Sequence, residues 1–167
     1  MRLLYLLRHA KSSWDDPALA DRDRPLARRG MRAGAALARH MEATGISPAL
    51  VLCSPARRTV DTLDLVAPAF GGQSEILVEE DLYGARSGDL LRHLRRVPAS
   101  TPSVMVVGHN PALHELVLTL ARGVGDLHRL REKFPTGALA TLAVSDPWRE
   151  LGKTAAELVE LVMPRDL

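Results

Sequence analysis

LYLLRHAKSSW, residues 4–14, runs from apolar residues directly into an arginine and a histidine. A short apolar run of this kind is typical of a strand that is buried on both faces of a parallel sheet. Arg8 and His9 follow at the end where this strand leaves the sheet. Because ligands of α/β sheets bind beyond the carboxyl ends of the strands, we predict that this pair faces a ligand.

Similar apolar runs recur along the chain and alternate with helical patterns. Buried strands are predicted at residues 3–7, 49–53, 76–78, 104–107 and 138–144, and a final strand at residues 155–163. Apolar residues with helical spacing predict helices around Leu37, Leu63 and Leu116, and a further helix is expected at residues 87–96. This alternation predicts an α/β fold with a mainly parallel sheet and helices on both faces.

Composition places limits on the class of protein. The 167 residues are 46% hydrophobic and 25% charged, which fits one globular domain over residues 1–167. A net charge of +2, with arginines scattered among acids, argues against a nucleic-acid partner. No apolar run approaches the ~18 residues of a membrane span, so no membrane partner is expected. Cys53 is the one cysteine; it rules out an intrachain disulfide and fits a cytoplasmic location.

A second strand end carries arginines. In CSPARRTVDT, residues 53–62, Ser54 is predicted as the N-cap of a helix and Pro55 as its first residue. Arg57 and Arg58 would then lie in the first turn, where a cation opposes the positive end of the helix dipole. A negatively charged ligand would reverse that cost.

A third strand end carries a histidine. In VVGHNPALHEL, residues 106–116, Gly108 leaves the strand, Asn110 is predicted to cap a helix and Pro111 to open it. His109 would therefore lie beside a helix N-terminus, which favours anions. Each feature alone is common in structural roles, but their coincidence at three strand ends points to one shared site. The set suits a phosphoryl group: Arg8, His9, Arg58 and His109.

Four motifs, RHAKSSW, DRPLARRG, SPARRTVDT and VVGHNP, resemble those of the histidine phosphatase superfamily, also called the phosphoglycerate mutase-like family. Within it, the chain is most similar to the SixA-type phosphohistidine phosphatases. The resemblance implies a phosphoglycerate mutase-like three-layer sandwich with no cofactor and no metal. It also implies that His9 is the nucleophile and that three residues form its phosphate pocket: Arg8, Arg58 and His109.

Two positions differ from the family pattern or vary within it. Ala10 stands where the family often has glycine after the Arg-His pair. Glu80, three residues before Tyr83 and Gly84, matches the general acid of larger members and is a further candidate catalytic residue.

The resemblance implies that His9 attacks phosphorus and that water then hydrolyses the phosphohistidine. Because 167 residues leave little chain for a lid, the expected substrate is phosphohistidine on a protein. The alternatives are a small phosphate ester as substrate, or an inactive protein that only binds phosphate.

Other phosphate and metal chemistries fit the spacing less well. The chain has six histidines, but His109 and His114 are five positions apart rather than four, and no His-Glu-x-x-His occurs. A cysteine phosphatase needs six positions from cysteine to arginine, whereas Cys53 and Arg58 are five apart. No glycine-rich turn follows the first strand, which argues against a dinucleotide site.

Overall fold

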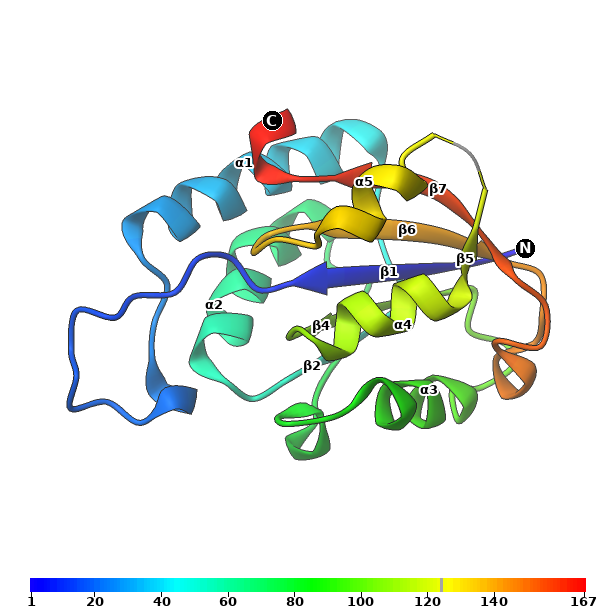
Figure 1. Ribbon diagram of the computed structural model, residues 1–167, viewed down its shortest axis with the longest axis horizontal. Coiled ribbons are helices and arrows are strands. Elements are labelled where there is room, and N and C mark those ends of the chain that lie inside the picture. The colour runs from blue at the N-terminus through cyan, green and yellow to red at the C-terminus, as the bar shows by residue number, and fades with distance from the viewer. Residues whose placement is uncertain (124) are drawn as a thin grey trace.

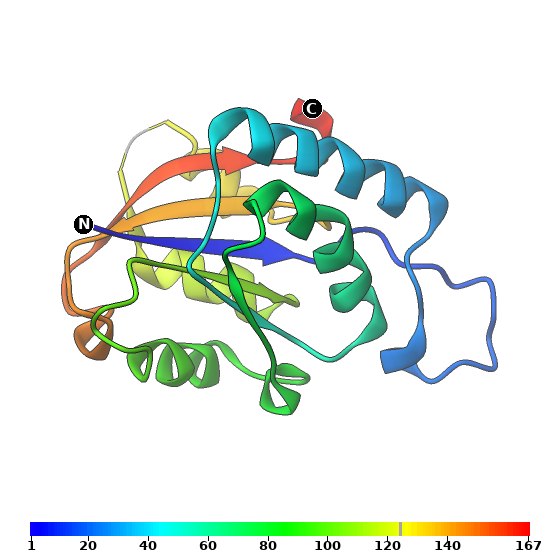
Figure 2. The same ribbon diagram turned by 180° about the vertical axis from the view of Figure 1, so that it is seen from behind.

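The computed structural model describes residues 1–123 and 125–167, which form one seven-stranded sheet between two layers of helices (Figures 1 and 2). The strand order is β3-β2-β4-β1-β6-β7-β5. The strands are β1 (Arg2–Arg8), β2 (Leu50–Cys53), β3 (Glu75–Val78), β4 (Ser103–Gly108), β5 (Ala121–Arg122), β6 (Leu139–Val144) and β7 (Ala156–Val162). The short strand β5 was not predicted from the sequence.

The sheet is mainly parallel, as predicted. β1 pairs in parallel with β4, β2 with both β3 and β4, and β5 with β7, whereas β6 is antiparallel to β1 and β7. Because β1, β2 and β4 run in the same direction, their last residues Arg8, Cys53 and Gly108 meet at one edge of the sheet. The chain segments that follow these strands therefore start close together.

Helices cover both faces of the sheet. α1 (Arg28–Thr44) and α2 (Arg57–Val66) lie on one face, and α3 (Ser87–Arg95), α4 (Ala112–Leu120) and α5 (Leu127–Glu132) lie on the other (Figures 1 and 2). The predicted helices are present, and α5 is an addition to them. Short 3-10 helices complete the fold: η1 (Asp21–Asp23), η2 (Ala67–Phe70), η3 (Glu80–Leu82), η4 (Trp148–Glu150) and η5 (Pro164–Asp166).

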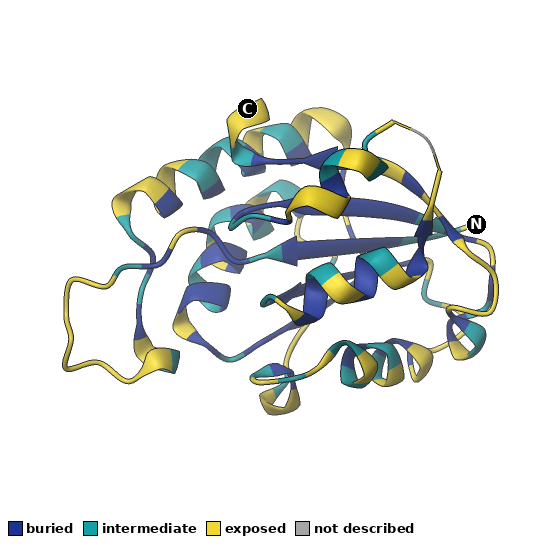
Figure 3. Cartoon of the chain, viewed as in Figure 1, coloured by how far each residue is buried: buried dark blue, intermediate teal, exposed yellow. Residues whose placement is uncertain are grey.

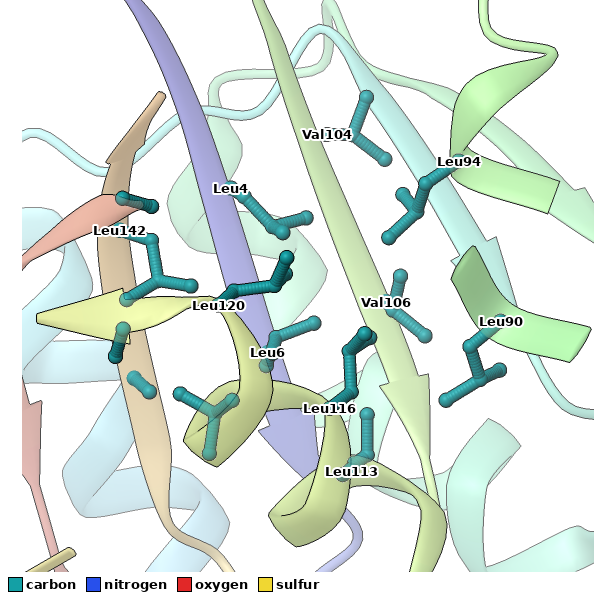
Figure 4. Close-up of a cluster of buried hydrophobic side chains, with 14 of the residues drawn as sticks. Leu4, Leu6, Leu90, Leu94, Val104, Val106, Leu113, Leu116, Leu120 and Leu142 are labelled. Carbon is teal, nitrogen blue, oxygen red and sulfur yellow. The ribbon is translucent and has the colours of Figure 1, made fainter. Parts of the chain in front are cut away.

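The alternation of side chains along β1 creates two hydrophobic cores. Leu4 and Leu6 point to the face that α3 and α4 cover (Figure 4), and Tyr5 and Leu7 point to the face that α1 and α2 cover. β4 repeats this pattern in register with β1. The predicted three-layer arrangement is therefore confirmed, and the sheet is its buried middle layer (Figure 3).

One predicted buried strand is not buried. Residues 76–78 do form part of β3, but Ile76, Leu77 and Val78 are 42%, 37% and 53% exposed. The reason is position, because β3 is the outermost strand and pairs only with β2 among the described residues.

None of the helices in the described part of the chain is both long and apolar enough to cross a membrane.

Candidate active site

His9 follows β1 directly and is held by backbone hydrogen bonds on both sides. Its N–H donates to the carbonyl of Gly108 (3.1 Å), and the N–H of Gly137 donates to the carbonyl of His9 (2.9 Å). The side chain is buried, and Nδ1 lies 2.7 Å from the carbonyl oxygen of Ala10. A carbonyl only accepts hydrogen bonds, so Nδ1 carries the proton and the lone pair of Nε2 is free.

Ala10 connects the histidine to α2. The N–H of Ala10 donates to Thr62 Oγ1 (3.0 Å), and the Thr62 hydroxyl donates to the carbonyl of Arg58 (2.7 Å). Ala10 is itself buried. The backbone beside His9 is thus fixed relative to the first turn of α2.

Arg58 lies in that first turn and is 7% exposed. It donates to the carbonyl of Asp21 from Nη1 (2.8 Å) and to Asp21 Oδ2 from Nη2 (3.1 Å). Arg57, its neighbour, is more exposed and pairs instead with Asp61 at 3.6 Å. The two arginines therefore differ in orientation as well as burial.

Asp21 holds Arg58 from η1. The hydroxyl of Tyr83 donates to Asp21 Oδ2 (2.6 Å), and this bond, together with Arg58, lowers the pKa of Asp21 to about 2. Asp21 is consequently ionised at neutral pH and accepts hydrogen bonds but supplies no proton.

His109 follows Gly108 and faces His9, with ring centroids 5.3 Å apart. Its Nε2 lies 2.8 Å from the hydroxyl of Ser54, which is wholly buried. The predictions that Ser54 caps α2 and that Pro55 opens it are wrong: the helix begins at Arg57, and Ala56 holds the N-cap position. The Ser54 hydroxyl lies against His109 and accepts only a long hydrogen bond from the N–H of Ala56 (3.4 Å).

The predicted cap of α4 is displaced by one residue. The helix begins at Ala112, and Pro111 rather than Asn110 holds the N-cap position. Asn110 still accepts a long hydrogen bond from the N–H of His114 (3.3 Å) through its side-chain oxygen. The N-terminus of α4 therefore lies beside His109, as the sequence predicted.

Several of the side chains described above line one pocket of about 480 Å³: His9, Asp21, Arg58, Tyr83 and His109. Arg8 ends β1, is half-buried and donates from Nη1 to the carbonyl of Phe134 (3.2 Å). Burial lowers the pKa of the Arg8 guanidinium, and the nearby charge of Arg58 adds to this effect. An anion between the two guanidinium groups would offset their repulsion. The four residues predicted from the sequence all line the pocket: Arg8, His9, Arg58 and His109.

Both pocket histidines are neutral at neutral pH. Burial is the main cause that lowers the pKa of His9 to about 3, and the charges of His109, Arg58 and Arg8 contribute, while the bond to Ala10 acts in the opposite direction. Burial, followed by the charge of Arg58, lowers the pKa of His109 to about 4. Burial thus lowers the pKa of each histidine more than the neighbouring cations do.

We therefore expect the rings of His9 and His109 to remain neutral as the pH falls from 7.5 to about 5.5, where an ordinary histidine with a pKa of ~6.5 is mostly protonated. Nitrogen-15 NMR of the ligand-free protein measures this directly, with the signals assigned by comparison with His9→Asn and His109→Asn. A titration midpoint near 6.5 for either ring would contradict the expectation.

Glu80 lies outside this pocket. It begins η3, its side chain is 73% exposed, and it pairs with Arg22 at 3.1 Å. Tyr83, at the far end of the same turn, lines the pocket and packs edge-on against His109 with ring centroids 5.9 Å apart.

The pocket also contains residues that sequence reasoning did not identify, above all Asp21, Tyr83 and Arg24. Arg24 is buried, donates to the hydroxyl of Ser12 (2.9 Å) and stacks on Trp14 at 3.5 Å from the ring centroid. Arg24 belongs to the DRPLARRG motif, and that motif was the signal in the sequence that could have identified it as a pocket residue. Tyr83 was noted only as part of the pattern that pointed to Glu80, and Asp21 carried no signal, because their contacts depend on loops that come together only in the fold.

The competing site chemistries find no support in the described part of the chain. No three histidine, cysteine or carboxylate side chains there lie close enough to hold a metal ion. His114 donates from Nε2 to the carbonyl of Leu130 (2.6 Å). Burial raises the pKa of Cys53 to about 12, so its thiol stays protonated.

Comparison with known proteins finds a family model and relatives that match this chain. Residues 4–90 match the family described as histidine phosphatase superfamily, branch 1. An uncharacterized protein of Mycobacterium tuberculosis (strain H37Rv) is 36% identical over 166 residues, covering 95% of this chain and all of that protein.

Two solved structures share the fold over 98% of this chain. A candidate phosphohistidine phosphatase SixA from Nakamurella multipartitia matches over 96% of its own chain with a TM-score of 0.84 and 31% identity. A candidate SixA from Agrobacterium tumefaciens matches over 98% of its own chain with a TM-score of 0.83 and 30% identity. The expected phosphoglycerate mutase-like fold is thereby confirmed.

Proposed function

The chain belongs to the histidine phosphatase superfamily, and we propose that it removes phosphate from phosphohistidine on proteins through a covalent phosphohistidine at His9. The observation that carries this proposal is a buried histidine with a free Nε2 lone pair in a pocket that three arginines line, Arg8 and Arg58 among them.

In the first step, the Nε2 lone pair of His9 attacks phosphorus. A P–N bond forms to His9 while the bond from phosphorus to the substrate imidazole breaks, and the leaving nitrogen takes a proton from water. Arg8 and Arg58 stabilise the negative charge on the phosphoryl oxygens during this in-line transfer. A bound phosphoryl dianion would also raise the pKa of His109 and favour its role as a donor.

In the second step, water attacks the phosphoryl group on His9. The P–N bond breaks and the phosphorus–oxygen bond forms. Phosphate keeps one proton of the attacking water, the other neutralises the hydroxide left by the first step, and His9 is restored in its neutral form. Because the pKa of His9 is low, the imidazole is a good leaving group in this step.

The proposed preference for phosphohistidine rests on which carboxyl groups could protonate a leaving group in the pocket. Among the described residues that line the pocket, Asp21 is the one carboxyl, and it is ionised. The pocket thus offers no protonated carboxylic acid for an alkoxide leaving group, and Glu80 lies outside it. An imidazole leaving group needs less acid assistance, so phosphohistidine suits this site better than a phosphate ester.

The test is a side-by-side measurement of kcat/KM for a phosphohistidine protein, phosphoglycerates and sugar phosphates at neutral pH. We expect the phosphohistidine protein to exceed every small ester by about 10²-fold, in line with what one general acid contributes. A preference for a small ester would make the chain a metabolite phosphatase. Binding without turnover of any substrate would make it a phosphate-binding protein.

The proposal includes a cytoplasmic location and a role in signal transduction. The lone cysteine, Cys53, is buried and reduced, which fits that location. A phosphohistidine on a protein is a transient signal, and its removal would end it.

A further inference from the structure

We propose that a second, basic pocket beside the active site binds an acidic side chain that flanks the phosphohistidine in the substrate protein. This inference rests on the proposed function, because it names the kind of protein segment on which that site acts. The basic pocket is defined by four cations: Lys11, Arg29, Lys133 and Arg165.

Four separate segments build the basic pocket, which has a volume of about 240 Å³. Lys11 follows β1, Arg29 lies in the first turn of α1, Lys133 follows α5, and Arg165 lies in η5. η5 lies beside α1 near the C-terminus, which brings the last of these segments into place (Figures 1 and 2). No local stretch of sequence reveals the cluster.

The four cations have no ion-pair partner of their own within the described residues. None of them forms an ion pair with a carboxylate, and no carboxylate lines the pocket. Asp166, next to Arg165, accepts hydrogen bonds from Arg129 (2.8 Å) and from the N–H of Met163 (2.9 Å). Four cationic side chains gathered without a carboxylate in the lining, in a chain whose net charge is only +2, mark this pocket as a site for an anion.

Most of the remaining lining of the basic pocket is apolar. Pro135, Met163 and Pro164 contribute to it together with Ala33, and Met163 is 1% exposed. Such a lining suits the methylene groups of a side chain whose carboxylate contacts the cations. A cavity of this size admits one side chain rather than the face of a macromolecule.

The basic pocket adjoins the catalytic pocket. Lys11 and Thr136 line both of them. A peptide that places its phosphohistidine against His9 therefore has neighbouring residues within reach of the second pocket. Glutamate or aspartate is the side chain that combines the required charge with a short apolar stem.

The test compares synthetic phosphohistidine peptides that differ at flanking positions by glutamate, glutamine or lysine. Wild-type protein should show kcat/KM about tenfold higher for the glutamate peptide than for its glutamine counterpart, because two exposed ionic contacts are each worth several-fold. The preference should shrink at 1 M salt, where the Debye length falls to ~3 Å.

The double variant Arg29→Glu/Arg165→Glu should lose this preference and favour the lysine peptide. The control variant Arg32→Glu/Arg39→Glu changes two exposed arginines of α1 that do not line the pocket, and thus makes the same change in net charge. It should retain the wild-type order of peptides. A reversal of peptide preference cannot come from a merely unstable protein, so this readout separates binding from folding.

The possible failures are distinguishable. If wild type hydrolyses no phosphohistidine peptide, the proposed function has failed. If it hydrolyses the three peptides equally, or if both double variants behave alike, the function stands and the acidic-side-chain inference is overturned. The inference would also be overturned if Arg29→Glu/Arg165→Glu lowered kcat/KM only for a small ester that carries a second phosphate and left the peptide preference unchanged.

Discussion

Replacement of His9 by alanine is expected to abolish the covalent phosphoenzyme and to lower kcat/KM by ~10⁴-fold or more, as loss of a nucleophile does in other covalent enzymes. The bond from Nδ1 to Ala10 leaves Nε2 of His9 free, whereas Nε2 of His109 lies 2.8 Å from the Ser54 hydroxyl. The variant retains His109 in the pocket, but its Nε2 faces Ser54 and its Nδ1 is buried, so neither nitrogen is exposed to take the place of His9.

The measurement is rapid quench followed by intact mass at neutral to alkaline pH, where a phosphoramidate survives. Wild type should show an adduct of one phosphate, and His9→Ala should show none. His128→Ala, which removes an exposed histidine that pairs with Glu132 on α5, is the matched control and should retain the adduct. An adduct of equal yield on His9→Ala would refute His9 as the nucleophile.

Arg58→Ala should lower kcat/KM by ~10²–10³-fold, the usual loss when one preorganised donor to a developing negative charge is removed. Arg58 is buried at the pocket, and both terminal nitrogens of its guanidinium donate hydrogen bonds to Asp21. Alanine also leaves Asp21 without that partner. Arg58→Lys keeps the charge but loses the planar fork, and we expect it to fall between the wild type and Arg58→Ala.

Arg57→Ala is the matched control for this prediction. Arg57 occupies the neighbouring position of the same helix turn, but it is more exposed and pairs with Asp61. We expect less than a ~3-fold change in kcat/KM, because exposed ion pairs contribute little. Comparable losses in the two alanine variants would mean that Arg58 does not contact the phosphate, and thermal unfolding of each variant checks that the fold is intact.

Much of the fold was predictable because buried parallel strands are short apolar runs that end in polar residues. Arg8 and His9 follow such a run, and so does His109. Their positions at the edge of the sheet could therefore be predicted from the sequence alone. The exposure of β3 was not predictable, since Ile76, Leu77 and Val78 are as apolar as a buried strand. Strand order decides exposure, and it depends on pairing between distant segments.

The partners of the site residues were harder to predict than the residues themselves. Ser54 has the side chain and position of an N-cap, yet its hydroxyl contacts His109, from another strand end. Asp21 and Tyr83 are 62 positions apart, yet Asp21 Oδ2 accepts hydrogen bonds from both Tyr83 and Arg58. Local sequence patterns report helix and strand periodicity, whereas these contacts require the tertiary fold.

The central place of β1 in the sheet has a consequence for biosynthesis. Leu3 pairs with Ser103 on one side and with Ala143 on the other, so its partners are made 100 and 140 residues later. At ~5–20 residues per second, this apolar strand waits several seconds on the ribosome before it can be paired. The backbone of His9 is likewise bonded to Gly108 and Gly137. The first part of the catalytic machinery to leave the ribosome is therefore among the last to be assembled, and an unfinished chain holds no working pocket.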